Sequence, residues 1–174
     1  MQYTYLLIHP SSSIFIDYIF RMILNDNFVI LKVYRISNWD TILFDIYRNS
    51  FRKKASVYKH VVAHAYINKY MFGNHGLLVF LFKKDVSIEN LINDTLSIKR
   101  KIREKINKTK SNGDIEIYLK NGNKIIDVFL SYLHCPDTKE QYCEDFKTFR
   151  NYVKEINVLS ENEVINVLRY HSFF

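Results

Sequence analysis

Residues 3–37 read YTYLLIHPSSSIFIDYIFRMILNDNFVILKVYRIS, and this stretch decides the fold. Residues 3–8 are a short apolar run rich in β-forming side chains, which predicts a buried strand. In residues 11–25, apolar side chains recur at helical spacing behind serines that can act as N-caps, so a helix follows. An Asn-Asp-Asn sequence ends that helix, and residues 28–36 predict a second strand. The chain therefore begins with a strand, a helix and a strand.

The rest of the chain returns to this order after two further helices. The expected elements are helices at about 37–48 and 57–71, a strand at 77–82, a short helix at 87–93, a strongly basic helix at 97–110, two β-prone runs around Asn121-Gly122, and helices opened by capping boxes at Thr138 and Ser160. Without the hairpin strand, two strand-helix-strand units remain. This order predicts a mixed α/β (α+β) fold with a ferredoxin-like, split βαβ antiparallel sheet covered by helices, and an added β-hairpin.

Length and composition indicate one folded unit. A chain of 174 residues can bury a single core, and no linker or repeat divides it. We therefore expect one domain over residues 1–174, with residues 155–174 as a C-terminal helical extension. A hydrophobic content of 48% with only 4 Gly and 2 Pro argues against a disordered chain. The formal charge of +7 permits binding of phosphates, nucleic acid or an anionic membrane surface, and selects none of them.

Cysteine usage and hydropathy bear on the compartment. Cys135 and Cys143 are too few for a disulfide-stapled secreted scaffold. The N-terminus has no basic leader, and no run of 18 apolar residues could cross a bilayer. The expectation is a reduced, soluble, cytoplasmic protein without a membrane partner.

His134 is the first candidate for chemistry, because it follows a strand and directly precedes a helix. The free N–H groups and positive dipole end of a helix favour anions, so an imidazole there can accept a phosphoryl group. Such a histidine needs an acceptor to orient it, which Asp145 or Glu144 could supply. The alternative is an ordinary loop histidine at a helix entry.

Two other patterns each allow more than one interpretation. His60 and His64 share a helix face at the spacing of a metal site, and zinc could also use Cys135 and Cys143. The alternative is a pair of histidines at the edge of an amphipathic helix. The second pattern is the basic run of residues 99–110, KRKIREKINKTK. It can be a solvated basic face, a phosphate site or a nucleic-acid contact.

The chain resembles the nucleoside diphosphate kinase family over about residues 3–150. LSYLHCPDTKEQYCEDFKTF, residues 130–149, is similar to the family's strand, His-Gly-Ser-Asp motif and glutamate-rich helix. The resemblance places His134 at the phospho-accepting histidine and Asp145 at the glutamate that hydrogen-bonds it. It implies a ping-pong phosphotransferase that forms a phosphohistidine.

The same resemblance implies further site residues and ligands. It gives nucleotide or phosphate contacts to His9, Tyr47, Thr95, Lys99, Arg100, Arg103 and Ser131. His9 stands where the family has a lysine, Ser131 where it has an asparagine, and Glu89 near a family arginine. The implied cofactor is Mg²⁺ with a nucleoside triphosphate, and the implied partners are nucleotides. Sheets of this type often pair, so we expect a homo-oligomer.

Three functions remain open on the sequence. The first is phosphoryl transfer from a nucleoside triphosphate through His134 to a nucleoside diphosphate or another acceptor. The second is a non-catalytic nucleotide-binding or protein-docking module of the same fold, which the departures at His9, Glu89 and Ser131 favour. The third is nucleic-acid binding through the basic helix 99–110.

Overall fold

The computed structural model describes residues 2–53, 61–66, 68, 69, 73, 75–109, 114–118, 124–129, 133–152 and 156–158. Its labelled elements are β1 (Thr4–Ile8), η1 (Pro10–Phe15), α1 (Ile16–Asn25), β2 (Val29–Ile36), α2 (Trp39–Lys53), β3 (Gly76–Phe82), α4 (Ile88–Thr109), β4 (Asp114–Tyr118), β5 (Lys124–Phe129), β6 (Leu133–His134), α5 (Lys139–Asn151) and β7 (Ile156–Val158). Residues 61–66, 68 and 69 are also helical. Among the described residues, no helix is long and apolar enough to cross a membrane.

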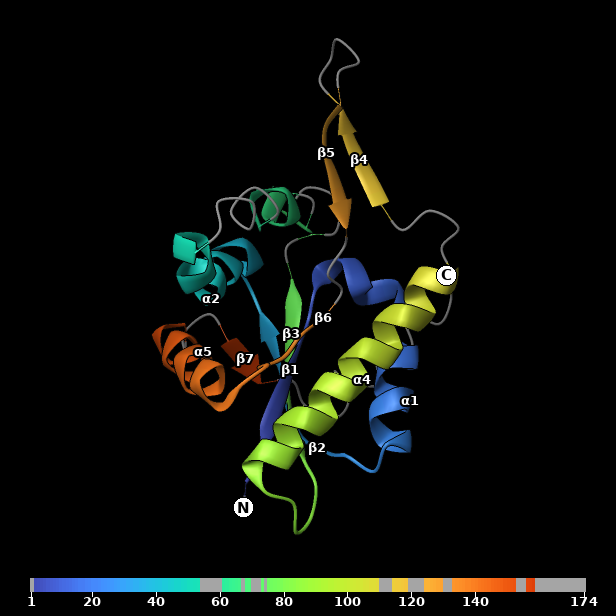
Figure 1. The fold of residues 1–174 in the computed structure, drawn as a ribbon, viewed down its shortest axis with the longest axis vertical. Helices are drawn as coiled ribbons and strands as arrows, with labels where there is room; N and C mark the ends of the chain where they lie inside the picture. Colours follow the sequence, from blue (N-terminus) through green and yellow to red (C-terminus); the bar gives the residue numbers. More distant parts are fainter. Residues whose placement is uncertain are drawn as a thin grey trace.

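One antiparallel sheet organises these elements. Its strand order is β6-β1-β3-β2-β7, and every neighbouring pair is antiparallel. The first four strands have the order of a ferredoxin-like sheet, which confirms the fold predicted from the sequence. Among the described strands, β4 and β5 pair with each other and not with the sheet. The Asn-Gly sequence predicts this pairing, and the two strands project from one end of the molecule (Figure 1).

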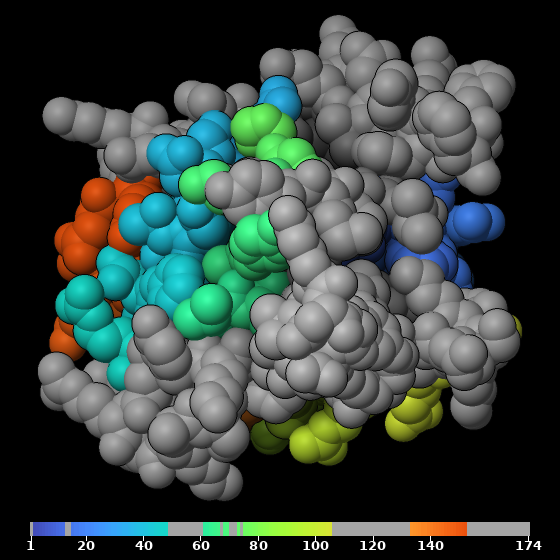
Figure 2. Space-filling model, turned by 90° about the horizontal axis from the view of Figure 1, so that it is seen from above, coloured from blue at the N-terminus to red at the C-terminus, as the bar shows by residue number. Residues whose placement is uncertain are grey.

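Helices cover both faces of the sheet, with α1 and α4 on one face and α2 and α5 on the other (Figure 1). The inner strand β1 is buried along its whole length, and its residues alternate between two cores. Leu6 and Ile8 join the core under α1 and α4, whereas Tyr5 and Leu7 join the core under α2 and α5. Figure 2 shows α2 in blue to cyan beside α5 in orange, at one side of the molecule.

Close packing against the second core explains Gly76 at the start of β3. A Cβ atom at Gly76 would lie 2.1 Å from Cε3 of Trp39, whose side chain is fully buried. Only glycine lets the indole ring of α2 approach the strand this closely. This contact places the start of α2 against the sheet, and α2 carries Tyr47 further along.

The first helix differs from the prediction at its start and agrees with it at its end. The serines of residues 11–13 lie in the 3₁₀ turn η1, and α1 begins only at Ile16 without a side-chain cap. At the other end, Asn27 adopts a positive φ of 63°, a conformation that asparagine tolerates. Its N–H donates to the carbonyl of Leu24 at 3.0 Å. The predicted Asn-Asp-Asn stop is therefore confirmed.

Three other boundaries correct the sequence prediction. The predicted helices at 87–93 and 97–110 are one helix, α4, because no Gly or Pro interrupts the chain and Leu91, Ile98 and Ile102 keep one buried face. The predicted second strand of the hairpin is divided into β5 and β6, so His134 lies in a strand and not beyond it. Residues 156–158 form β7 beside β2 and not part of a helical extension. The capping box at Ser160 lies outside the described residues.

Candidate functional site

His134 occupies the end of β6 and is hydrogen-bonded on both sides of its ring. Its Nε2 lies 3.1 Å from Oδ2 of Asp145, and its Nδ1 lies 3.1 Å from the hydroxyl of Tyr47. His134 is 4% exposed and Asp145 is 2% exposed. β6 pairs with β1 so that His134 is opposite Leu7, which holds the imidazole over the second core. Three elements, β6, α2 and α5, thus converge on one ring.

The protonation states of the partners assign the ring tautomer. Burial raises the pKa of Tyr47 to about 12, so its hydroxyl keeps its proton at neutral pH. The Asp145 carboxylate can only accept, so Nε2 carries the hydrogen that it receives. In the neutral form of the ring, Nδ1 then has the lone pair, and the Tyr47 hydroxyl donates to it. This arrangement directs the Nδ1 lone pair of the neutral tautomer away from the carboxylate.

Asp145 accepts a further hydrogen bond from the hydroxyl of Tyr5, also at Oδ2. Burial, followed by the charge of Asp145, raises the pKa of Tyr5 well above its ordinary range. Sequence reasoning missed Tyr5. The available signal was a tyrosine within a strand predicted to be buried, because a buried phenol usually has a hydrogen-bond partner.

The start of α5 explains how Asp145 reaches the ring. Thr138 is the N-cap, and its hydroxyl accepts from the N–H of Gln141 at 3.2 Å. The side chain of Gln141 accepts from the N–H of Asp137 at 2.9 Å, one residue before the position expected for a reciprocal capping box. Seven residues after the cap, two helical turns return Asp145 to the face that meets the sheet. Glu144, the other candidate orienting acid, is exposed.

Two cations of α4 reach the segment that surrounds His134. The ammonium of Lys99 lies 2.7 Å from Oδ1 of Asp137, and its side chain is 8% exposed. One turn further along, the guanidinium of Arg103 donates to the carbonyl oxygen of Leu133. Because Lys99 and Arg103 are four residues apart, they share one face of α4. Both carry positive charge to the β6 edge of the sheet, next to the backbone that holds His134.

His9 directly follows β1 in the same region and is 2% exposed. Its ring centroid lies 4.7 Å from that of Trp39 and 6.2 Å from that of His64. Neither ring nitrogen has a hydrogen-bond partner in the part of the chain that the structure describes. Burial, followed by the nearby His64, His134 and Arg103, holds the pKa of His9 well below its ordinary value. His9 is therefore a neutral imidazole beside the site.

The remaining residues expected to contact phosphate have different surroundings. Thr95 is fully buried, and its hydroxyl donates to the carbonyl of Leu91 at 2.7 Å, within its own helix. Arg100 is exposed on α4. Ser131 lies outside the described residues. Glu89 pairs with Lys139 at 2.8 Å, a contact that joins the first turns of α4 and α5.

No metal centre is assembled in the described part of the chain. Among those residues, no group of three or more His, Cys, Asp and Glu side chains could hold an ion. His64 is buried beside His9, and His60 lies outside the described ranges. Burial raises the pKa of Cys135 to about 11, so it remains a thiol, whereas Cys143 is exposed on α5. The zinc alternative finds no support in these residues.

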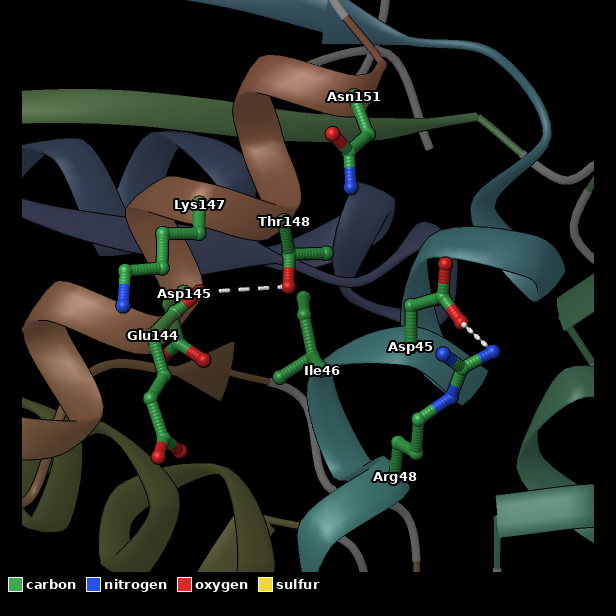
Figure 3. A pocket seen from close by; sticks show the side chains of 8 residues that line it. All are labelled: Asp45, Ile46, Arg48, Glu144, Asp145, Lys147, Thr148 and Asn151. Atoms are coloured by element: carbon green, nitrogen blue, oxygen red, sulfur yellow. Dashed lines mark hydrogen bonds and ion pairs between the residues drawn. The ribbon is translucent and has the colours of Figure 1, made fainter.

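A polar cavity of about 200 Å³ lies between α2 and α5, on another side of Asp145 (Figure 3). Its lining residues are Asp45, Ile46, Arg48, Glu144, Asp145, Lys147, Thr148 and Asn151. Arg48 pairs with Asp45 at 3.2 Å, and Thr148 donates to the carbonyl of Glu144 at 3.3 Å. The cavity brings charged side chains to the acid that contacts His134.

Comparison with known proteins adds little beyond the fold. No protein-family model matches the chain, and no curated protein does. Among solved structures, an NDP kinase from Pyrobaculum aerophilum aligns over 94% of this chain and 98% of its own, with a TM-score of 0.49 and 14% identity. A likeness of this size does not transfer an activity to this chain. The geometry of the site is the basis for proposing a function.

Proposed function

We propose that this protein transfers a phosphoryl group through a phosphohistidine at His134, from a nucleoside triphosphate to a nucleoside diphosphate or another acceptor. The observation that carries the proposal is the hydrogen-bonded series Tyr47–His134–Asp145. This series fixes one tautomer and leaves the nucleophilic lone pair on Nδ1. The resemblance of residues 130–149 to nucleoside diphosphate kinases implies the same chemistry.

In the first half-reaction, the Nδ1 lone pair of His134 attacks the γ-phosphorus. The bond between that phosphorus and the bridging oxygen breaks, and the diphosphate leaves with the electron pair. The ring becomes positively charged, and the hydrogen bond from Nε2 to Asp145 stabilises this charge. The Tyr47 hydroxyl must leave Nδ1 as the phosphoryl group arrives. The second half-reaction reverses these steps with the acceptor.

Positive groups near the ring would hold the phosphates. Arg103 and Lys99 lie on one face of α4, and the first turn of α5 adds the positive end of a helix dipole. Carboxylates that could hold Mg²⁺ by themselves are not grouped in the described residues, so a protein-held ion does not fit this site. A magnesium ion would have to arrive on the nucleotide, and we derive no step through it.

The first prediction is that labelled ATP phosphorylates the wild-type chain on His134. The label should be acid-labile and stable to alkali, as expected for a phosphohistidine, and His134→Gln should remove it. Asp145→Asn should slow labelling by about 10- to 100-fold, because a charge-assisted hydrogen bond contributes roughly 1.5–3 kcal/mol. The measurement is the rate of label incorporation after rapid mixing.

His75→Gln is the matched control, since His75 is exposed before β3. It should keep the wild-type labelling rate. No label with any nucleoside triphosphate at high protein concentration would contradict the proposal. A label that survives in His134→Gln would place the chemistry on another residue.

Non-catalytic nucleotide binding is the second candidate, because three expected phosphate contacts already have other surroundings. Lys99 is paired with Asp137, the Thr95 hydroxyl is bonded within its helix, and His9 is neutral and buried. Calorimetry distinguishes the two functions. Nucleotide binding without any label on His134 would favour the second.

A further inference from the structure

We propose that Tyr5 is a positioning residue that controls the His134 ring through Asp145. Tyr5 and His134 both direct a hydrogen toward the same oxygen, Oδ2 of Asp145, from two different strands. This role rests on the proposed function for its effect on phosphoryl transfer. Its effect on the ring itself can be measured without any reaction.

The surroundings of Tyr5 make its hydrogen bond necessary. Tyr5 is fully buried in β1, and its ring lies 5.0 Å from that of Phe149, 5.8 Å from Phe146 and 6.3 Å from Tyr142. A hydroxyl without a partner in such an aromatic cluster would lose its hydration with no compensation. Asp145 provides the acceptor. The elevated pKa of Tyr5 keeps its proton in place, so it acts as a donor.

Asp145 needs this second donor because it lies between two different environments. On one side are Tyr5 and His134, and on another is the polar cavity (Figure 3). Charged side chains of both signs line that cavity, and Arg48 there is paired with Asp45, so the carboxylate of Asp145 has other polar surroundings to turn toward. The hydrogen bond from His134 is a single contact, and by itself it would let the carboxylate of Asp145 rotate about it. The hydroxyl of Tyr5 anchors Oδ2 from a second direction and keeps it facing Nε2.

The shared oxygen also affects the position of the ring proton. The hydrogen bond from Tyr5 stabilises the ionised form of Asp145, which can only accept hydrogen bonds, so the ring hydrogen is favoured on Nε2 of His134. This tautomer is the one that leaves the lone pair on Nδ1 beside Tyr47. Tyr5 therefore orients the acid and maintains the nucleophilic form of the histidine, although it does not contact the ring nitrogens.

The test compares Tyr5→Phe with Tyr142→Phe by ¹⁵N NMR of histidine-labelled protein. Both variants remove one hydroxyl and keep the ring, but the Tyr142 hydroxyl donates to the backbone carbonyl of Tyr3 and not to Asp145. In wild type and Tyr142→Phe, the His134 resonances should report hydrogen on Nε2 alone. In Tyr5→Phe, the Nδ1 and Nε2 resonances should move toward each other, as a mixture of tautomers requires.

The same two variants should also differ in the rate of phosphohistidine formation. Tyr5→Phe should slow phosphohistidine formation by about tenfold, whereas Tyr142→Phe should leave it unchanged. If Tyr5→Phe matches Tyr142→Phe in both tautomer and rate, the inference is overturned. If Tyr5→Phe does not fold, 3-fluorotyrosine at position 5 keeps the ring and hydroxyl but donates more strongly. The His134 resonances must then shift, and unchanged resonances would equally overturn the inference.

Failure of the proposed function can be separated from failure of this inference. A wild-type protein that takes no label refutes phosphoryl transfer through His134. The tautomer measurement still decides whether Tyr5 controls the ring, because it needs only the folded protein without nucleotide.

Discussion

His9 directly follows β1 and lies near the rings of Trp39 and His64, at a position where the resemblance to nucleoside diphosphate kinases implies a phosphate contact. A lysine there would carry a fixed charge, whereas burial, followed by the basic groups around it, lowers the pKa of this imidazole and keeps it neutral. The residue type was visible in the sequence. Its protonation state follows from side chains on three other elements, which the sequence does not place.

The state of His9 predicts a specific loss of stability in acid. Because its pKa is lower in the folded state, the unfolded chain takes up a proton first as the pH falls below about 6.5. Folding stability therefore falls below that pH, by up to about 1.4 kcal/mol per pH unit for this one group. We expect His9→Gln to lose less stability than wild type between pH 7.5 and 5.5. Urea unfolding at both pH values measures the difference, and equal losses would show that His9 is not the group responsible.

The two cysteines should differ sharply in reactivity. Cys135 is fully buried with a pKa of about 11, so at pH 8 only about one molecule in a thousand carries its thiolate. Cys143 is exposed. A colorimetric thiol reagent should modify one thiol rapidly in the folded protein and both in denaturant. Cys143→Ala should remove the rapid phase; a rapid phase that persists in this variant would mean that Cys135 is accessible.

At the scale of elements, α5 links local sequence to the site. The Thr138 cap was predicted from four adjacent residues, and the structure confirms the bond to Gln141. Prediction worked here because capping, helix period and the spacing from His134 to Asp145 are all local. It failed for α4, where a change in charge within one helix suggested two, although the buried face continues without a break.

Removing the cap should destabilise the protein through α5. Thr138→Ala should cost about 1 kcal/mol in the free energy of unfolding, and Thr138→Ser should restore most of it. Thr148→Ala is the control, since the Thr148 hydroxyl only bonds to a carbonyl of its own helix and alanine is a better helix former. Chemical denaturation measures all three. Equal effects for Thr138→Ala and Thr148→Ala would contradict a capping role.

At the scale of the whole molecule, one sheet separates two cores and must couple them. Leu6 belongs to the core under α1 and α4, while Trp39 belongs to the core under α2 and α5. Neighbouring residues of β1 face opposite cores, so neither core can open without loosening the strand they share. The molecule should therefore unfold as a single cooperative unit.

Leu6→Ala tests this coupling, because Leu6 lies in one core and the fluorescent Trp39 lies in the other. The substitution should reduce the free energy of unfolding by about 3 kcal/mol, as buried leucine truncations do. Trp39 is the single tryptophan of the chain, so fluorescence reports on the other core. Fluorescence and circular dichroism midpoints should fall together in urea. A fluorescence midpoint that stays at the wild-type value would show that the two faces unfold separately.

The sequence by itself determined the first strand-helix-strand unit, the hairpin, and the candidate pair of His134 and Asp145, eleven residues apart. These features depend on periodicity, turn residues and helix spacing, which act over short distances along the chain. The tertiary structure alone placed Tyr47 on Nδ1 and Tyr5 on Asp145, at sequence separations of 87 and 140 residues. It also revealed β7 at the far edge of the sheet. Such contacts arise only when strand order brings distant elements together, and no local pattern carries that information.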